Sequence, residues 1–292
     1  MIVKKESLEL FLISFLALFL ELAIIRWLST EIRIFAYFKN LPLMAAFLGF
    51  GVGCYLHHRS ERLFYFWFPK IFVWLVLIIA LAPMLNITHV IFVDPRQFFL
   101  LGTGLGDHAS HSAPSLYQSI KALSVIVCLY FLVMAVFAAL CSKLGELLNR
   151  TAPLTGYSIN VLGSLCGVGL FSLVSFLRWP PGFWLIIAFA LLSYFHFARR
   201  SLWWVSGYFV IAVGTTTLAG VSYPALWSPY YKVMVEADRP LGIPIFHVLV
   251  NYDGFQMIQP FAPQFANRVR EADRGLYNRH YDLPFRLSKR PV

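Results

Sequence analysis

Charged side chains are scarce in this 292-residue chain: Asp, Glu, Lys and Arg make up 13% of it, whereas hydrophobic residues make up 59%. Soluble globular proteins carry about 25% charged and about 45–50% apolar residues. The composition therefore excludes an ordinary water-soluble globule. Acidic residues are fewer than basic ones, 14 against 24, and the resulting +10 charge is scattered between apolar blocks. Scattered basic residues indicate membrane loops rather than a nucleic-acid surface.

Cysteine is also scarce, and the chain lacks a recognisable secretory cleavage site. The four cysteines, all in or beside apolar runs, are Cys54, Cys128, Cys141 and Cys166. Their spacing indicates neither a disulfide framework nor a zinc site. Lys4 and Lys5 precede the first apolar run, but that run is long and no small-residue cleavage site follows Trp27. We therefore expect a retained membrane anchor rather than a signal peptide.

Long apolar runs fill most of the chain up to residue 223. A helix needs about 20 residues to cross about 30 Å of hydrocarbon, and seven runs are candidates. They span Leu8–Leu28, Leu41–Leu56, Ile71–Val93, Ile120–Leu140, Thr155–Leu177, Pro181–Phe197 and Leu202–Tyr223. The second is short unless it includes residues 34–38. The fold predicted for residues 1–223 is a mainly α, polytopic bundle of about seven transmembrane helices in the lipid bilayer.

The basic residues between the runs predict how the bundle is oriented, because Lys and Arg accumulate in cytoplasmic loops. With seven spans, one side collects nine Lys and Arg and the other five, which favours a cytoplasmic N-terminus. An odd number of spans places the tail after Pro224 outside. That tail carries nine more Lys and Arg, which suit the inside, so its side of the membrane stays open.

Residues 224–292 form a tail in which short alternating stripes replace the continuous runs. The stripes are Tyr231, Val233 and Val235, then Phe246, Val248 and Val250. Turns are expected at Asp238–Gly242 and Asp253–Gly254. These patterns predict a small antiparallel β-hairpin or meander, and apolar residues spaced by four over residues 261–269 predict a short helix. A segment this small rarely stabilises itself, so we expect it to rest on the bundle, a second subunit or a further domain.

Glu21 lies in the middle of the first run, where an unpaired carboxylate costs several kcal/mol. Arg26 follows five positions later, about 140° around the helix, so the two are poorly placed to pair. One interpretation is an interior acid that lines a substrate or proton path. The other is a structural hydrogen-bond anchor against Asn160 or a neighbouring helix.

Two pairs of glycines spaced by four, in the second and fifth runs, predict close helix packing. They are Gly49 with Gly53, and Gly163 with Gly167. Small residues at this spacing allow helix backbones to approach closely, and Asn160 and Ser164 are candidates for hydrogen bonds across helices.

The stretch 98–107 imitates a strand followed by a glycine-rich nucleotide loop, but it leads into a polar loop and another apolar run instead of a βαβ unit. His108 and His111, with Asp107, are a weak pattern for a metal. The sequence therefore predicts no catalytic residue, no cofactor and no metal site in this chain.

Four stretches of the bundle region resemble one family. They are residues 20–28, LELAIIRWL; residues 35–41, FAYFKNL; residues 47–53, FLGFGVG; and residues 160–167, NVLGSLCG, running on to Pro180 and Pro181. These stretches are similar to the helices of bacterial membrane-embedded spermidine synthase-like proteins. The resemblance implies a location in the bacterial inner membrane.

Three stretches of the tail resemble the N-terminal β-hairpin region of aminopropyltransferases: residues 227–233, WSPYYKV; residues 249–256, LVNYDGFQ; and residues 281–284, YDLP. In that family the hairpin covers a methyltransferase-like domain that binds decarboxylated S-adenosylmethionine. The resemblance implies that Tyr231, Gln256 and Tyr281 face the substrate. Where soluble members carry Gln, this chain has Lys232.

The resemblance also implies what should follow residue 292, because the Rossmann-like catalytic domain of the family begins there. We therefore expect the membrane and hairpin part of a split or truncated spermidine synthase-like protein. Such a part is not catalytic alone, and its partner is a methyltransferase-like catalytic domain or subunit, or a second copy, but not nucleic acid. One alternative is a polytopic transporter of a polyamine or other cationic amine with Glu21 on its pathway, and another is a purely structural membrane partner.

Overall fold

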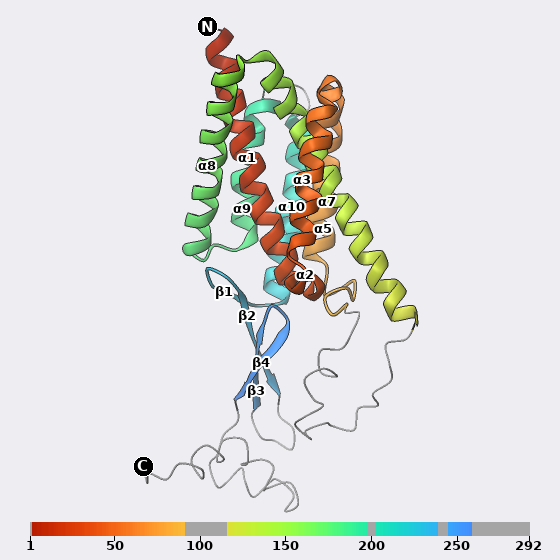
Figure 1. Cartoon of the computed structure of the whole chain (residues 1–292). Coiled ribbons are helices and arrows are strands. Elements are labelled where there is room, and N and C mark those ends of the chain that lie inside the picture. Colours follow the sequence, from red (N-terminus) through yellow and green to blue (C-terminus); the bar gives the residue numbers. More distant parts are fainter. Residues whose placement is uncertain (1, 91–115, 198–201, 239–244, 259–292) are drawn as a thin grey trace, which may run out of the picture. The chain divides into compact units, whose positions relative to one another are not determined.

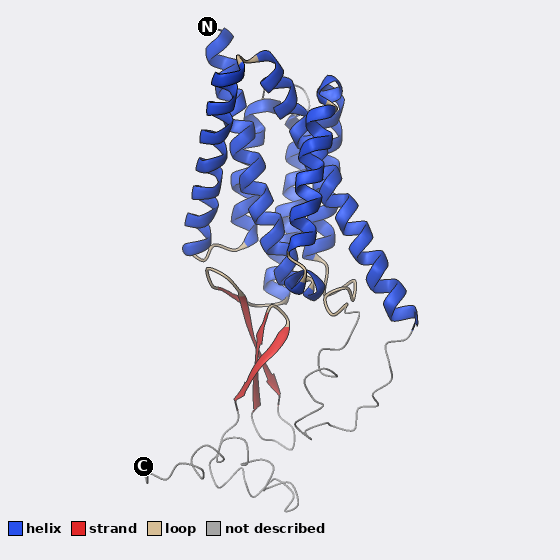
Figure 2. Ribbon diagram, viewed as in Figure 1, coloured by secondary structure: helices blue, strands red, loops and turns tan. Residues whose placement is uncertain are grey.

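The structure is a computed structural model that describes residues 2–90, 116–197, 202–238 and 245–258 (Figure 1). These residues are mainly helical, with a small antiparallel sheet at the C-terminal end of the described part (Figure 2). The predicted architecture of apolar helices followed by a small β-rich tail is confirmed at this level. The chain divides into two compact units, residues 1–232 and residues 233–292.

The first unit contains all of the described helices. They are α1 (Ile2–Glu31), α2 (Arg33–Tyr37), α3 (Asn40–Tyr55), η1 (His57–Arg59), α4 (Ser60–Arg62), η2 (Leu63–Trp67), α5 (Phe68–Ala80), α7 (Leu116–Arg150), α8 (Pro153–Phe176), α9 (Pro181–His196) and α10 (Leu202–Ser222). The four elements from η1 to α5 follow one another without a break as 3₁₀, α, π and α turns.

Among the described residues, five helical segments are long and apolar enough to cross a membrane. They are Lys5–Glu31, His57–Ala80, Ser119–Arg150, Pro153–Phe176 and Leu202–Ser222. The apolar helices α3 and α9 have 16 residues each, which at 1.5 Å per residue is about 24 Å and shorter than the hydrocarbon layer. Every one of the seven predicted runs contains a helix, and the segments are compatible with a multi-pass membrane protein. The count of seven crossings stays a prediction.

Two predicted helix boundaries were wrong. The run predicted to start at Ile71 belongs to a helix that starts at His57 and ends at Ala80, and the turns that follow include Pro83. The charged residues at its start had suggested a loop, but they lie in helical turns. The run predicted to end at Leu140 belongs to a helix that continues to Arg150. Charged residues can continue this helix because they pair with one another along one face.

Two helix pairs are packed through glycine, α3 against α7 and α1 against α8. A Cβ atom at Gly53 would lie 2.6 Å from the carbonyl oxygen of Ala138, and one at Gly49 would lie 2.5 Å from that of Met134. Gly163 and Gly167 press on α1 in the same way, against the backbones of Phe11 and Phe15. No side chain larger than hydrogen fits at these four positions unless the helices move apart.

Aromatic rings fill the core between α5, α9 and α10. Phe64, Phe68 and Phe72 follow one another along one face, with ring centroids 6.0 and 5.6 Å apart. Phe72 then contacts Phe209 of α10, which lies 4.8 Å from Phe189 of α9. Buried aromatic side chains contribute large contact areas, so this row joins three helices that are distant in sequence.

The sheet has the order β1 (Leu226–Trp227), β2 (Lys232–Asp238), β3 (Ile245–Val250) and β4 (Asp253–Ile258). In the second unit β2 and β3 are antiparallel, with Val233 opposite Val250 and Val235 opposite Val248, so the two predicted stripes face each other. Strands β3 and β4 are also antiparallel, with a register shift at Val248/Leu249.

The turn predicted at Asp253–Gly254 was displaced by two residues. Asn251 and Tyr252 form the two-residue connection, with φ of 52° and 63°, and Asp253 opens β4 opposite Val250. Positive φ at both positions is the geometry that joins twisted antiparallel strands most tightly, and Asn adopts it readily. The turn predicted at Asp238–Gly242 and the helix predicted over residues 261–269 lie outside the described residues.

Gly53→Ala should destabilise the bundle by about 1–3 kcal/mol, because the added methyl group overlaps the α7 backbone. Gly51→Ala is the matched control on the same helix, since nothing lies within 4 Å of a Cβ there, and it should be neutral or stabilising by up to about 1 kcal/mol. Reversible unfolding in detergent micelles measures both. Equal effects of the two variants would contradict close packing of α3 on α7.

Candidate functional site

Arg26 is the centre of the most unusual polar group in the first unit. Its Nη2 donates a hydrogen bond to the carbonyl oxygen of Ser228 at 2.6 Å. Its guanidinium carbon lies 5.1 Å from the ring centroid of Trp184 and 5.7 Å from that of Trp227, and the two indoles are 5.5 Å apart at 77°. Both distances are within the range of cation–π attraction. We call Arg26, Trp184, Trp227 and Ser228 the Arg26 cluster.

Local backbone geometry presents the Ser228 carbonyl to Arg26. The Ser228 N–H donates to the carbonyl oxygen of Tyr231 at 2.8 Å, and the N–H of Tyr231 donates to the Ser228 hydroxyl at 2.8 Å. The Tyr230 N–H also donates to this hydroxyl, at 3.3 Å. Serine closes turns of this kind because its short side chain reaches the backbone a few residues on. The chain between β1 and β2 is therefore fixed locally before it meets the bundle.

A buried ion pair fixes the same segment a second time. The Lys232 ammonium donates to both carboxylate oxygens of Glu31, at 2.8 and 2.9 Å, and the two side chains are only 7% and 8% exposed. Two charges can be buried together only when they neutralise each other with good geometry. Arg26–Ser228 and Glu31–Lys232 together are named the α1 clamp, because both join α1 to residues 228–232.

Glu21 lies one and a half turns before Arg26 and is 2% exposed. Its Oε2 has no hydrogen-bond partner, and within the described residues neither Arg26 nor Asn160 contacts it through an ion pair or hydrogen bond. An apolar cavity of about 10 Å³ lies nearby between α1, α5 and α9, lined by residues such as Leu20, Ile24 and Trp184. It has room for little more than one water-sized molecule.

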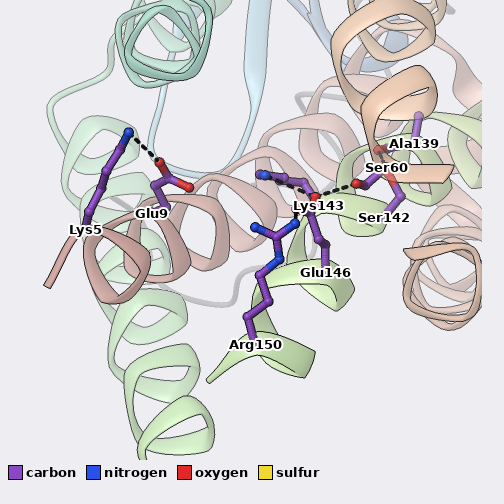
Figure 3. A network of polar contacts seen from close by, with 8 residues as sticks. All are labelled: Lys5, Glu9, Ser60, Ala139, Ser142, Lys143, Glu146 and Arg150. Atoms are coloured by element: carbon purple, nitrogen blue, oxygen red, sulfur yellow. Dashed lines mark hydrogen bonds and ion pairs between the residues drawn. The ribbon is translucent and has the colours of Figure 1, made fainter. Parts of the chain in front are cut away.

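A second polar group, the Glu146 cluster, lies on α7 and α4 (Figure 3). Lys143 and Arg150 approach the Glu146 carboxylate at 3.1 and 2.6 Å, and the Ser60 hydroxyl donates to it. Ser60, Lys143 and Glu146 are all buried. Each charged group in this cluster has a partner of opposite charge, which is the arrangement expected of a structural network. The pair between Lys5 and Glu9, at 3.9 Å, is longer and more exposed.

The predicted substrate-facing residues are distributed over different parts of the chain. Tyr231 is 49% exposed at the end of the Ser228 turn, in the first unit. Gln256 is exposed on β4 opposite Val248, in the second unit. Tyr281 lies outside the described residues, as do the glycine-rich stretch 98–107, His108 and His111.

The described residues show no grouping of cysteines or of other possible metal ligands into a site. Cys54, Cys128, Cys141 and Cys166 are free thiols. In residues 2–90, 116–197, 202–238 and 245–258, no three His, Cys, Asp or Glu side chains lie together where they could hold a metal ion.

Sequence reasoning missed the partners of the α1 clamp. Glu31 and Lys232 are 201 positions apart, and no local pattern connects them. Part of the Glu146 cluster can be predicted from the sequence, because Lys143, Glu146 and Arg150 are spaced by three and four, as on one helix face. Lys143 and Arg150 were counted instead among the basic residues between the apolar runs.

Comparisons of the chain with protein-family models, with curated proteins and with solved structures found no match.

Lys232→Met should destabilise the protein by about 3–5 kcal/mol, because it leaves the Glu31 carboxylate buried and uncompensated. The double variant Glu31→Gln with Lys232→Met should recover much of that loss. Lys5→Met is the control, since it breaks an exposed pair at 3.9 Å and should cost less than about 1 kcal/mol. Unfolding curves in micelles measure all three, and a Lys232→Met effect as small as that of Lys5→Met would rule out the buried pair.

Proposed function

We propose that this protein is the membrane-anchoring and substrate-covering part of a spermidine synthase-like assembly in the bacterial inner membrane. A methyltransferase-like catalytic domain or subunit supplies the chemistry and binds decarboxylated S-adenosylmethionine. In this proposal the N-terminus is cytoplasmic, and Tyr231, Gln256 and Tyr281 face the substrate. The protein contributes position and cover rather than catalysis.

The α1 clamp is the observation that carries this proposal. Two of the stretches that resemble the family, residues 20–28 and residues 227–233, meet through Arg26 and Ser228. They are distant in sequence, yet the Arg26–Ser228 hydrogen bond joins them. The buried pair adds a second link, from Lys232 within the second stretch to Glu31, three residues after the first. A covering hairpin needs a fixed point of entry, and the clamp gives β2 such a point at its first residue.

The sheet itself supports a role in covering a partner. Four large apolar side chains on β2, β3 and β4 are exposed: Val235, Phe246, Phe255 and Ile258, with exposed fractions of 41–74%. Apolar residues grouped on so small a sheet are typical of a surface that another protein covers. A methyltransferase-like partner would bury them.

Photo-crosslinking from the sheet tests the proposal. Benzoylphenylalanine in place of Phe255, which is 74% exposed, should crosslink in native membranes to a polypeptide that mass spectrometry identifies as methyltransferase-like. The control is the same group in place of Leu154 of α8, which is 80% exposed in an apolar helix and should meet lipid. Crosslinks from position 255 only to lipid, or to the same proteins as from position 154, would contradict the proposal.

A polyamine transporter is the second candidate, and the buried Glu21 carboxylate with its unpartnered Oε2 favours it. An interior acid is a common element of cation pathways in membrane proteins. If the protein transports an amine, Glu21→Gln should abolish uptake of labelled spermidine into proteoliposomes, while Glu9→Gln near the start of α1 should not. Under the anchoring proposal neither variant differs from the parent protein, and Glu21-dependent uptake would favour transport instead.

A further inference from the structure

Arg26 is a permanent cation for which the described residues supply no counterion. Its guanidinium group carries five N–H donors, and the Ser228 carbonyl accepts from Nη2. Nε and Nη1 are buried and have no hydrogen-bond partner. A buried donor without an acceptor costs about 1–3 kcal/mol, and more when it is charged. These two nitrogens carry three N–H groups. The described residues supply no acceptor for any of the three.

The surroundings of Arg26 are favourable for an anion. Trp184 is 1% exposed and its indole N–H also has no acceptor. Trp184 lies in the first turn of α9. The N-cap residue of this helix is Pro180, whose side chain cannot accept a hydrogen bond from that turn. The N-terminus of a helix carries a partial positive charge. Glu31, the next acid after Arg26 along α1, is already neutralised by Lys232.

The position of the Arg26 cluster along its helices indicates the source of such an anion. Arg26 lies five residues before the end of α1, about 7.5 Å along the helix axis, and Trp184 is the fourth residue of α9. Tryptophan in membrane proteins concentrates at the level of the lipid headgroups. Arg26 as a whole is only partly buried, and a headgroup oxygen reaches its covered Nε and Nη1 once a neighbouring side chain moves aside.

We propose that the Arg26 cluster is a binding site for a phosphate group, with Arg26 Nε and Nη1 as its donors and the indoles of Trp184 and Trp227 holding the guanidinium plane. Arginine binds phosphate oxygens strongly because both groups are charged and the donors are fixed in a plane. A lipid headgroup and soluble phosphate share this chemistry. The proposal does not depend on the spermidine synthase-like assembly, because it uses residues of the bundle unit alone.

Calorimetric titration of the full-length protein in neutral detergent tests the site. The two probes are a short-chain phosphatidylglycerol and inorganic phosphate, each compared with sodium chloride at equal ionic strength. Arg26→Lys keeps the charge and one donor for Ser228 but loses the planar set, so the Kd should rise about tenfold or more. Arg178→Gln is the matched control, because it removes an exposed arginine just before α9, and the Kd should stay within about twofold.

Each result has one meaning. Arg26-dependent binding of phosphatidylglycerol alone supports a lipid headgroup site, and Arg26-dependent binding of both probes supports a site for phosphate in general. Absence of binding to the parent protein, or equal losses in Arg26→Lys and Arg178→Gln, overturns the proposal. If Arg26→Lys does not fold, Trp227→Leu removes one of the two rings that hold the guanidinium plane, and an unchanged Kd in that variant also overturns the proposal.

Discussion

The buried pair between Glu31 and Lys232 is the constraint on which the arrangement of this chain depends. It closes a loop of some two hundred residues, which contains every described helix from α2 to α10, and so it joins the end of α1 directly to the start of β2. Closing so long a loop costs conformational entropy, although that cost grows only slowly with length. The contact is specific because either charge alone would be unstable in its buried position. The ion pair thus fixes the start of β2 against the end of α1.

The sequence predicted local features well and long-range contacts poorly. The apolar runs predicted a helix in each of seven places, because hydrophobic length is a direct requirement of a membrane helix. The stripes at Val233 and Val250 predicted an antiparallel pair. Turn geometry was harder, because Asp-Gly at 253–254 is a stronger local signal than Asn251–Tyr252, and the register of the strands decided between them.

The candidate site was predicted only in part. Arg26 was recognised as unusual from its position in an apolar run, but its partners are Trp184, Trp227 and a backbone carbonyl, none of which carries a charge. A pattern of charges in a sequence indicates only pairs of charged residues. This cluster therefore could not be predicted from the sequence. The same limit applies to Ser60, which meets Glu146 only because α4 packs on α7.

The length of α7 has a consequence for the depth of the protein in a membrane. Its 35 residues extend over about 52 Å, well beyond the thickness of a hydrocarbon layer, and its last turns carry Lys143, Glu146 and Arg150. Glycine contacts fix α3 along this helix, so the two cannot slide independently. A thinner bilayer must therefore tilt the pair as one body, whereas a thicker one draws the charged turns toward the acyl chains, which makes the tilt of the bundle sensitive to lipid chain length.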